Sequence, residues 1–246
     1  MFSIFKKKVY PKTNLSAIGC DMHSHLLPGI DDGSPDTDTS IRLIEGLTDL
    51  GYSKLITTPH IMWDIYKNDA TTIASAYDQL HQQSPQSTAF LHTAAEYYLD
   101  DHFDQNLVNN KPLLTLKDKW VLVEFSFVTL PVNLKQTLFN LQISGYQPIL
   151  AHPERYLYFL EDKKKYDELY EAGCFFQLNL LSLIGYYGKG PQELADYLIK
   201  KKYVRLLGTD LHHDRHLHAL QTSAQLNDLV KFLLDTGKIM NSTLLD

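Results

Sequence analysis

Asp21-Met22-His23-Ser24-His25 is the stretch that decides the fold, and it runs directly into Leu26-Leu27-Pro28-Gly29-Ile30-Asp31-Asp32-Gly33. The apolar residues 17–20 before it are typical of the end of a short strand. Two imidazoles two residues apart on an extended chain point to the same side, because side chains alternate along a strand. Histidine and aspartate side chains that converge where a strand ends suit a metal ion, because nitrogen and oxygen ligands are then held on a rigid element.

The composition fits one large α/β domain. The sequence has 246 residues, of which 44% are hydrophobic and 21% charged, and single α/β barrels commonly reach this size. A formal net charge of −6 offers no basic face for phosphates, so nucleic acid is not an expected partner. No apolar run approaches the about 20 residues of a transmembrane helix. Cys20 and Cys174 match no zinc-finger or redox spacing and indicate a reducing compartment, so we expect a cytoplasmic protein.

The start of the chain is expected to be an arm, residues 1–17, ahead of a single domain at residues 18–246. Lys6, Lys7 and Lys8 follow an apolar start without the hydrophobic core of a signal peptide. Three lysines could touch an anionic membrane surface, but a frayed terminus is the preferred interpretation.

Strand and helix patterns alternate along the rest of the chain. The expected strands are residues 17–20, 54–58, 88–95, 120–124, 147–151, 174–179 and 203–208. The expected helices are residues 36–50, 70–83, 100–110, 134–144, 163–172, 192–202 and 216–234. Such alternation predicts parallel strands that are covered on both faces. No Gly-x-Gly-x-x-Gly follows the first strand, so a distorted barrel is favoured over a doubly wound open sheet.

All but one of these strands are followed by a histidine or a carboxylate, and the exception ends at Asn179. The residues concerned are His23, His25, His60, Glu96, Glu124, His152, Asp210 and His212. The carboxyl ends of the strands are where barrels build their active sites, although a single carboxylate there often only caps the next helix. Asp32 is a ninth candidate, in the loop after the first strand, and Asp31 competes for its role.

Five histidines and four carboxylates are too many ligands for one four-coordinate zinc ion. The sequence therefore predicts two or three divalent ions that share bridging carboxylates. Mixed imidazole and carboxylate ligands suit Mn, Fe, Zn or Co and do not choose among them.

Short phrases around these residues resemble the polymerase-and-histidinol-phosphatase (PHP) superfamily. They are His23-Ser24-His25, Thr58-Pro59-His60, Ala95-Glu96-Tyr97-Tyr98, Glu124-Phe125-Ser126, Ala151-His152-Pro153-Glu154-Arg155-Tyr156 and Thr209-Asp210-Leu211-His212. Asp31-Asp32-Gly33, the Glu124 phrase and the His152 phrase narrow the resemblance to the manganese-dependent tyrosine phosphatases of bacterial capsule and exopolysaccharide operons (the CpsB/YwqE type). The resemblance runs from Asp21 to His212 with the motifs in the same order.

The resemblance implies a distorted (β/α)7 TIM-like barrel of the PHP type that binds three metal ions, with manganese expected and Mg an alternative. The nine ligand positions would be filled by His23, His25, Asp32, His60, Glu96, Glu124, His152, Asp210 and His212. Arg155 and Arg215 would hold the phosphate, and Asp32 and His212 would join them in catalysis. The spacing from His212 to Arg215 is slightly shorter than the family pattern suggests.

A phosphotyrosine-protein phosphatase is the expected function. Clustered divalent ions lower the pKa of a bound water from 15.7 to roughly 7 and take up phosphoryl charge, so that hydroxide attacks the phosphoryl group. The tyrosine leaving group has a pKa near ~10 and needs less protonation than an alkoxide. The expected partner is a tyrosine-phosphorylated protein, the C-terminal tail of a bacterial tyrosine kinase that controls polysaccharide export. That partner would bring the chain to the inner face of the membrane, and a homo-oligomer is left open.

Three alternatives stay open. A small-molecule phosphoesterase such as a histidinol-phosphate phosphatase would share the ligands, and a metal-dependent amidohydrolase also begins with His-x-His. A non-catalytic scaffold that binds the kinase tail is the alternative outside the enzymes. A cysteine mechanism is disfavoured, because the sixth residue after each cysteine is Leu26 or Leu180 and not arginine.

Aromatic residues near the expected site could line its mouth, although packing is the simpler interpretation for each one. Tyr186 and Tyr187 are the preferred substrate-binding pair, because they follow a strand on the side of the site. His213, His216 and His218 are expected on a solvated helix face.

Overall fold

The computed structural model describes residues 12–246. The lysines of the expected arm, residues 6–8, lie outside the described residues. Thr13 and Leu15 are buried, and the Leu15 N–H donates to the carbonyl oxygen of Leu50 at 2.6 Å. Part of the expected arm therefore packs against the body, while the boundary at residue 17 stays a prediction.

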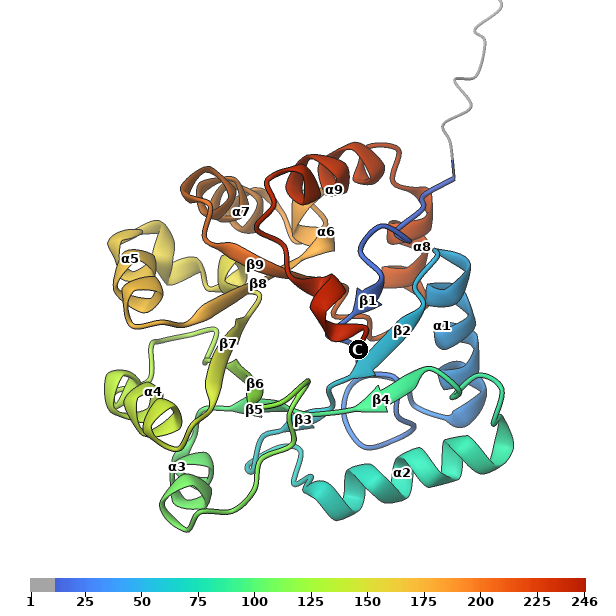
Figure 1. The fold of residues 1–246 in the computed structure, drawn as a ribbon, viewed down its shortest axis with the longest axis horizontal. Helices are drawn as coiled ribbons and strands as arrows, with labels where there is room; N and C mark the ends of the chain where they lie inside the picture. Colours follow the sequence, from blue (N-terminus) through green and yellow to red (C-terminus); the bar gives the residue numbers. More distant parts are fainter. Residues whose placement is uncertain (1–11) are drawn as a thin grey trace, which may run out of the picture.

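Parallel strands form the centre of the molecule, and the helices lie around them (Figure 1). The strands are β1 (Cys20–Asp21), β2 (Lys54–Thr57), β3 (His60–Ile61), β4 (Leu91–Thr93), β5 (Glu96–Tyr98), β6 (Trp120–Glu124), β7 (Gln147–Ala151), β8 (Phe175–Asn179) and β9 (Val204–Gly208). They form a three-stranded sheet in the order β1-β2-β4 and a six-stranded sheet in the order β3-β5-β6-β7-β8-β9, and every pair in both sheets is parallel. The expected α/β fold with parallel strands is confirmed.

Helices separate most of the consecutive strands. They are α1 (Thr37–Asp49), α2 (Ala70–Gln83), α3 (Asp101–Val108), α4 (Leu134–Ile143), α5 (Lys164–Glu171), α6 (Leu180–Leu183), α7 (Lys189–Lys201), α8 (Asp214–Thr222) and α9 (Leu226–Asp235), with 3₁₀ turns η1 (Pro153–Arg155), η2 (Leu157–Leu160) and η3 (Asn241–Leu244). Within residues 12–246, none of the helices combines the length and apolar character that crossing a membrane requires.

Carboxylates fix the starts of three of these helices. Asp36 accepts a hydrogen bond from the Thr39 N–H at 2.8 Å, and Asp100 accepts one from the Phe103 N–H at 2.8 Å. Asp69 and the Thr72 side chain form a reciprocal capping box on α2. Each of these bonds satisfies a backbone donor that the helix itself leaves unpaired.

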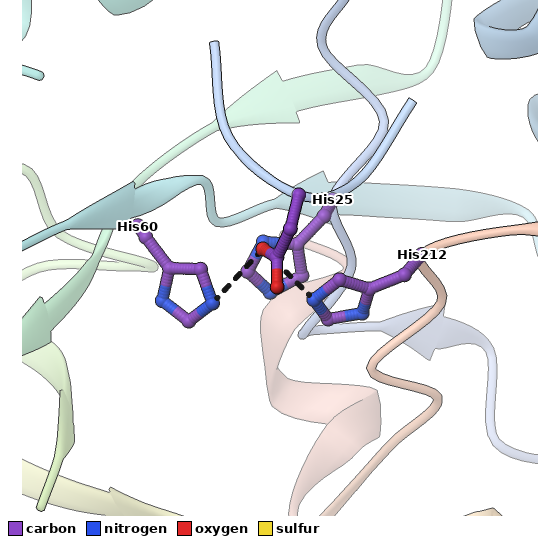
Figure 2. Close-up of side chains that lie close together, drawn as sticks. His25, His60 and His212 are labelled. Atoms are coloured by element: carbon purple, nitrogen blue, oxygen red, sulfur yellow. Dashed lines mark ion pairs between the residues drawn. The ribbon is translucent and has the colours of Figure 1, made fainter. Parts of the chain in front are cut away.

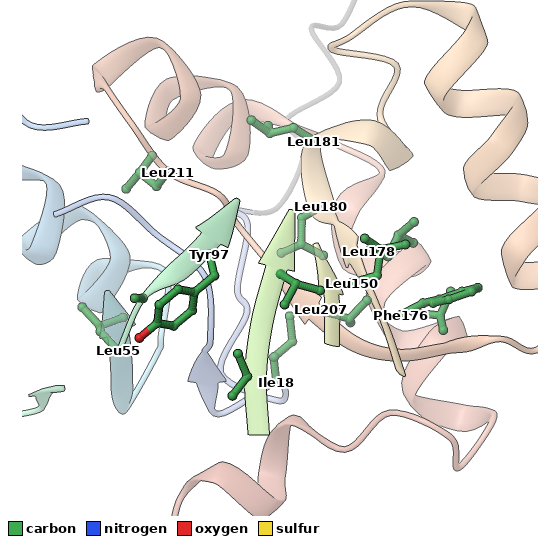
Figure 3. Packing of buried hydrophobic residues seen from close by; sticks show 14 of the residues in the cluster. Ile18, Leu55, Tyr97, Leu150, Phe176, Leu178, Leu180, Leu181, Leu207 and Leu211 are labelled. Atoms are coloured by element: carbon green, nitrogen blue, oxygen red, sulfur yellow. The ribbon is translucent and has the colours of Figure 1, made fainter. Parts of the chain in front are cut away.

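Both faces of most strands are buried, as expected for parallel strands covered by helices, and β4, where His92 is exposed, is the exception. In β6, Val121 and Val123 pack in the main core between strands and helices, part of which Figure 3 shows. Leu122 belongs to a second cluster of strand side chains on the opposite face. Glu124 shares that inner face with Leu122, since side chains alternate along a strand.

The first and last strands come together beyond their ends. Ser24 and Leu211 form an isolated parallel bridge, the His25 N–H donates to the Leu211 carbonyl at 2.9 Å, and the Asp210 N–H donates to the His23 carbonyl at 2.7 Å. Asp21 adds a side-chain link, because its carboxylate accepts the Thr209 N–H at 2.9 Å. Residues almost two hundred positions apart in the sequence thus become neighbours.

Three local expectations are wrong. The expected strand 54–58 is followed by a second short strand, β3, because Pro59 lacks the N–H that would continue the ladder. The expected strand 88–95 is shortened to β4, and a further strand, β5, begins at Glu96, so His60 and Glu96 begin strands instead of following them. The expected helix 216–234 is two helices, α8 and α9, separated by residues 223–225.

Candidate metal centre

The pairing of the strands places the candidate ligands side by side. His60 of β3 is the direct partner of Glu96 in β5, and Tyr98 of β5 is the direct partner of Glu124 in β6. The bridge between the first and last strands brings His23 and His25 next to the segment that carries Asp210. The register alone therefore gathers side chains from distant parts of the sequence at one end of the strands.

One group of ligands lies at the mouth of the site. His25, Asp32, His60 and His212 each offer an atom within 4.8 Å of the others. Asp32 Oδ1 lies 3.5 Å from His60 Nε2 and 3.6 Å from His212 Nε2, and Figure 2 shows these two imidazoles together with that of His25. The side chain of Asp32 is 53% exposed, so this group opens to solvent.

The deeper candidate ligands surround Glu96, whose side chain is fully buried. Its Oε2 lies 3.2 Å from His23 Nε2 and 3.2 Å from His60 Nδ1, and its Oε1 lies 3.2 Å from His152 Nε2. The three further groups that could hold an ion are His23-Glu96-His152, His23-His25-Asp210 and His60-Glu96-Glu124. Each of the nine candidates named from the sequence lies in at least one group, and the groups share members.

Hydrogen bonds on the far side of three imidazoles aim their other nitrogen at the cluster. Asp31 Oδ2 lies 2.8 Å from His25 Nδ1, and the carbonyl oxygen of Asp210 lies 2.9 Å from His212 Nδ1. A carbonyl or carboxylate oxygen only accepts, so each Nδ1 carries the proton and each Nε2 lone pair is free for a cation. This arrangement is typical of metal-binding histidines.

Gln177 orients the imidazole of His23 in the same way. Its Oε1 accepts the His152 backbone N–H at 3.2 Å, which identifies that atom as the amide oxygen. The same oxygen lies 2.8 Å from His23 Nδ1, so this nitrogen must be the donor and Nε2 faces Glu96. Gln177 lies on β8 and is fully buried.

Buried carboxylates and imidazoles lie close enough at the site to shift one another's pKa values. Burial raises the pKa of Glu124, and the negative charges of Glu96 and Asp210 raise it further, well above its usual value. Burial alone would also raise the pKa of Glu96, but His23 and His60 hold it well below its usual value. Three carboxylates this close together repel one another unless positive charge lies between them.

The residues present fit bound cations. Glu96 Oε1 and His60 Nδ1 are buried and have no hydrogen-bond partner within residues 12–246. His23 Nε2 and His25 Nε2 face each other at 3.3 Å, and neither carries a proton in the tautomers assigned above. Buried polar atoms normally have partners, and facing lone pairs of nitrogen and oxygen are what divalent ions bind.

The backbone around the ligands is unusual at three positions. His152 and Asp210 have positive φ angles of 32° and 50°, a conformation that non-glycine residues adopt at some cost. Gly33 lies so close to His25 that an added Cβ would be 2.3 Å from the His25 carbonyl oxygen. The loop that carries Asp32 can therefore approach His25 only with glycine at this position.

Arg155 lies at the edge of the cluster between two aromatic rings. Its Nη1 lies 2.6 Å from Asp210 Oδ2, and its side chain is 24% exposed. The guanidinium carbon lies 4.4 Å from the ring centre of Tyr187 and 5.0 Å from that of Phe127. These contacts hold a planar cation beside the candidate metal ligands, where it can form parallel hydrogen bonds to a phosphate.

A buried hydrogen-bond network supports this edge. Glu154 Oε1 accepts hydrogen bonds from the Asn179 N–H at 2.9 Å and from the Ser182 hydroxyl at 2.7 Å. Asn179 Nδ2 in turn donates to Asp210 Oδ2 at 3.0 Å and to the Tyr187 hydroxyl at 3.3 Å. The strand that lacks a histidine or carboxylate at its end thus supplies an amide that orients two site residues.

The remaining candidates lie further out. Arg215 is exposed in the first turn of α8, and among the described residues no ion pair joins it to the cluster. Tyr186 is 41% exposed and packs edge-on against Tyr187 and His216. The expectation of a solvated His216 is wrong, because Tyr186, Tyr187 and His213 pack around its ring. Cys20 and Cys174 are free and buried, and burial raises the pKa of each thiol to about 12.

Four residues near the centre escaped the sequence analysis as functional residues: Phe127, Glu154, Gln177 and Asn179. Only the amides left a weak signal in the sequence. Gln177 lies two positions before the end of a strand, so it shares the inner face with Asn179.

Comparisons with known proteins place the chain among related sequences. A sequence model of the family described as capsular polysaccharide synthesis, CpsB/CapC, matches residues 19–226. The chain is 32% identical over 196 residues to the tyrosine-protein phosphatase YwqE of Bacillus subtilis (strain 168), covering 78% of this chain and 77% of that protein. It is 26% identical over 202 residues to the tyrosine-protein phosphatase CpsB of Streptococcus pneumoniae, covering 78% and 82% of the two chains.

A solved structure is similar over nearly the whole chain. It comes from a study of YwqE from Bacillus subtilis and CpsB from Streptococcus pneumoniae, described as unique metal-dependent tyrosine phosphatases. The TM-score is 0.73 at 28% sequence identity, and the match covers 90% of this chain and 96% of the other.

Proposed function

The chain belongs to the capsular polysaccharide synthesis family CpsB/CapC, and on this premise we propose that it is a metal-dependent tyrosine-protein phosphatase. The relatives named above are tyrosine-protein phosphatases. One observation in this chain carries the proposal: nine histidine and carboxylate side chains from distant segments converge into overlapping groups of metal-binding geometry, with Arg155 at their edge.

Two or three divalent ions, with manganese the expected metal, would be held by the nine residues. The ligands proposed are His23, His25, Asp32, His60, Glu96, Glu124, His152, Asp210 and His212. Bound there, the ions would supply Lewis acidity toward phosphoryl oxygens and would lower the pKa of water. Of the four carboxylates, Glu96 alone belongs to two groups, and because a carboxylate has two oxygens it is the best candidate for a shared ligand.

Arg155 would bind the phosphate of the substrate. One of its nitrogens pairs with Asp210, and the fixed guanidinium fork leaves further N–H donors for phosphoryl oxygens. The rings of Tyr187 and Phe127 pack against the guanidinium and would help to orient this fork. Arg215 would have to approach by a movement of α8 or of its own side chain.

The charge of Asp32 favours a tyrosine oxygen as the leaving group. Burial raises the pKa of Asp32, but the histidines around it, His212 foremost, lower it below its usual value. An ionised Asp32 is a poor proton donor, and a tyrosine oxygen departs with less protonation than an alkyl oxygen does. The charge state of the mouth therefore favours aryl over alkyl phosphates.

We also infer a closed, distorted (β/α)7 barrel. The bridge between Ser24 and Leu211 supports closure, because it joins the segments that follow the first and last strands. The continuations of β2 into β3 and of β4 into β5 would make each pair one bent strand of the barrel. Closure would explain why ligands from the first and last motifs share one site.

The phosphoprotein we propose is the tail of a bacterial tyrosine kinase in capsule or exopolysaccharide synthesis. The family description supports this proposal. Two free cysteines agree with a reducing cytoplasm, where such a tail would lie at the inner face of the membrane.

Chelation followed by addition of single metals tests the function. The stripped protein should lose turnover of a phosphotyrosyl peptide and regain it with manganese. Glu96→Gln should lower both bound metal and turnover at least about 10-fold, as expected for loss of a central ligand. Glu168→Gln, on the exposed side of α5, is the matched control and should change neither. Full turnover by a protein without metal would refute the proposal.

A further inference from the structure

Phe127 is a large apolar side chain that stays exposed beside the candidate site. Its relative exposure is 45%, although it packs on three site residues. Its ring lies 5.0 Å from the Arg155 guanidinium carbon, 5.7 Å from the His152 ring and 5.4 Å from the Tyr156 ring. A single exposed phenylalanine lowers solubility but by itself needs no explanation. Here, however, the ring of Phe127 packs against Arg155, the residue proposed to bind the phosphate.

Two hydrogen bonds anchor the backbone of the two residues just before Phe127. The Tyr158 hydroxyl donates to the Ser126 carbonyl at 3.1 Å, and the Phe125 N–H donates to the Tyr156 hydroxyl at 3.0 Å. Tyr156 is itself fully buried. The ring is therefore held before any ligand arrives, which lowers the entropy cost of binding against it.

The other two aromatic candidates are less available. Tyr187 packs on Arg155 with its ring, and its hydroxyl accepts a hydrogen bond from Asn179. Tyr186 packs edge-on against Tyr187 and His216, away from the guanidinium. Phe127 both contacts Arg155 and keeps part of its ring exposed to solvent.

We propose that Phe127 is a specificity-determining residue, whose exposed ring packs against the tyrosyl ring of the substrate while Arg155 holds the phosphate. An aryl phosphate carries its ring on the ester oxygen, so a phosphate on Arg155 brings that ring to the surface next to the guanidinium. Phe127 forms that surface. Aromatic rings attract each other at such separations beyond the effect of buried area, and an alkyl phosphate gains nothing comparable. The proposal rests on the phosphatase function proposed above and names what selects its substrate.

Two variants and one control test this role with the metal-loaded enzyme. Phe127→Ala removes the ring, Phe127→Leu keeps apolar volume without it, and Val128→Ala alters the neighbouring residue, which is 86% exposed. Phosphotyrosine and phosphoserine are compared as substrates, because they differ only in the group that carries the phosphate. Binding of phenylphosphonate and methylphosphonate by calorimetry gives a second readout that does not require turnover.

Phe127→Ala should lower kcat/KM for phosphotyrosine roughly 10-fold and that for phosphoserine less than about threefold, with Phe127→Leu between wild type and Phe127→Ala. Phenylphosphonate binding should weaken in parallel, methylphosphonate binding should not, and Val128→Ala should match wild type. An equal fall for both substrates would overturn the proposal, because Phe127 would then act only through Arg155. Unchanged kinetics would overturn it as well. A wild-type enzyme that hydrolyses neither substrate would refute the phosphatase function itself.

Discussion

Replacing Gln177 with leucine should weaken metal binding although Gln177 itself contacts no ion. The Gln177 amide oxygen fixes the His23 tautomer at 2.8 Å and also accepts the His152 N–H at 3.2 Å. Leucine has a similar size and no acceptor. His23 would then be free to rotate or to move its proton to the nitrogen that faces Glu96.

Two magnitudes follow from these contacts. Loss of the partner that orients a metal-binding histidine costs about 10–100-fold in metal affinity, which is about 1.4–2.7 kcal/mol. The folded state also loses the acceptor of two buried donors, at about 1–3 kcal/mol for each donor, so the free energy of unfolding should fall by roughly 2–6 kcal/mol. Both donors are buried, since His23 and His152 are at most 1% exposed.

Metal affinity is measured by competition with a chelating dye, and stability by denaturant unfolding of the metal-free protein. Gln177→Glu is the matched variant, because a carboxylate keeps both acceptor bonds, and it should bind metal as tightly as wild type or more tightly. If Gln177→Leu binds metal with wild-type affinity, Gln177 does not orient His23 and the assigned tautomer is wrong.

Three further predictions test the rest of the site. Arg155→Lys keeps a charge opposite Asp210 but loses the planar fork, so kcat/KM on a phosphotyrosyl peptide should fall about 100-fold while metal content, measured by elemental analysis, stays constant. Cys20→Ser and Cys174→Ser should leave turnover within about twofold of wild type, because burial raises the pKa of both thiols to about 12 and keeps them protonated, and loss of turnover in folded protein would revive a thiol mechanism. Burial raises the pKa of Glu154 from 4.5 to about 7, so the folded state retains a proton that the unfolded state releases, and the free energy of unfolding should fall as the pH rises from 4.5 to 7. Denaturant unfolding measures this fall in the free energy of unfolding, and Glu154→Gln should reduce it by up to about 3 kcal/mol. A Glu154→Gln protein with the same fall as wild type would contradict the raised pKa.

The order of strands and helices could be predicted from the sequence, because the spacing of apolar residues along the chain distinguishes strands from helices. Residues 120–124 and 147–151 matched the expected strands residue for residue. The division of the tail into α8 and α9 was not readable, since the apolar period continues across residues 223–225 while the backbone turns. The break before His60 has a local cause in Pro59, whereas the break before Glu96 depends on pairing with different neighbouring strands, which local pattern does not contain.

The candidate ligands were readable because all but Asp32 lie at the start or end of a strand or a few residues beyond its end, and parallel strands present those positions together. The residues that orient them were not, because Gln177 and Asn179 acquire their roles only through contacts across the sheet. Phe127 was overlooked for another reason: its function depends on being exposed next to Arg155, and exposure of a single residue has no sequence period.

Crystals grown with manganese, and an anomalous difference map collected near the manganese absorption edge, test most directly whether these side chains bind metal together. Two or three peaks are expected among His23, His25, His60, Glu96 and Asp210, with the remaining four ligands completing their coordination. A map without peaks at this end of the strands, in protein shown to be active, would contradict the proposed metal centre and the chemistry built on it.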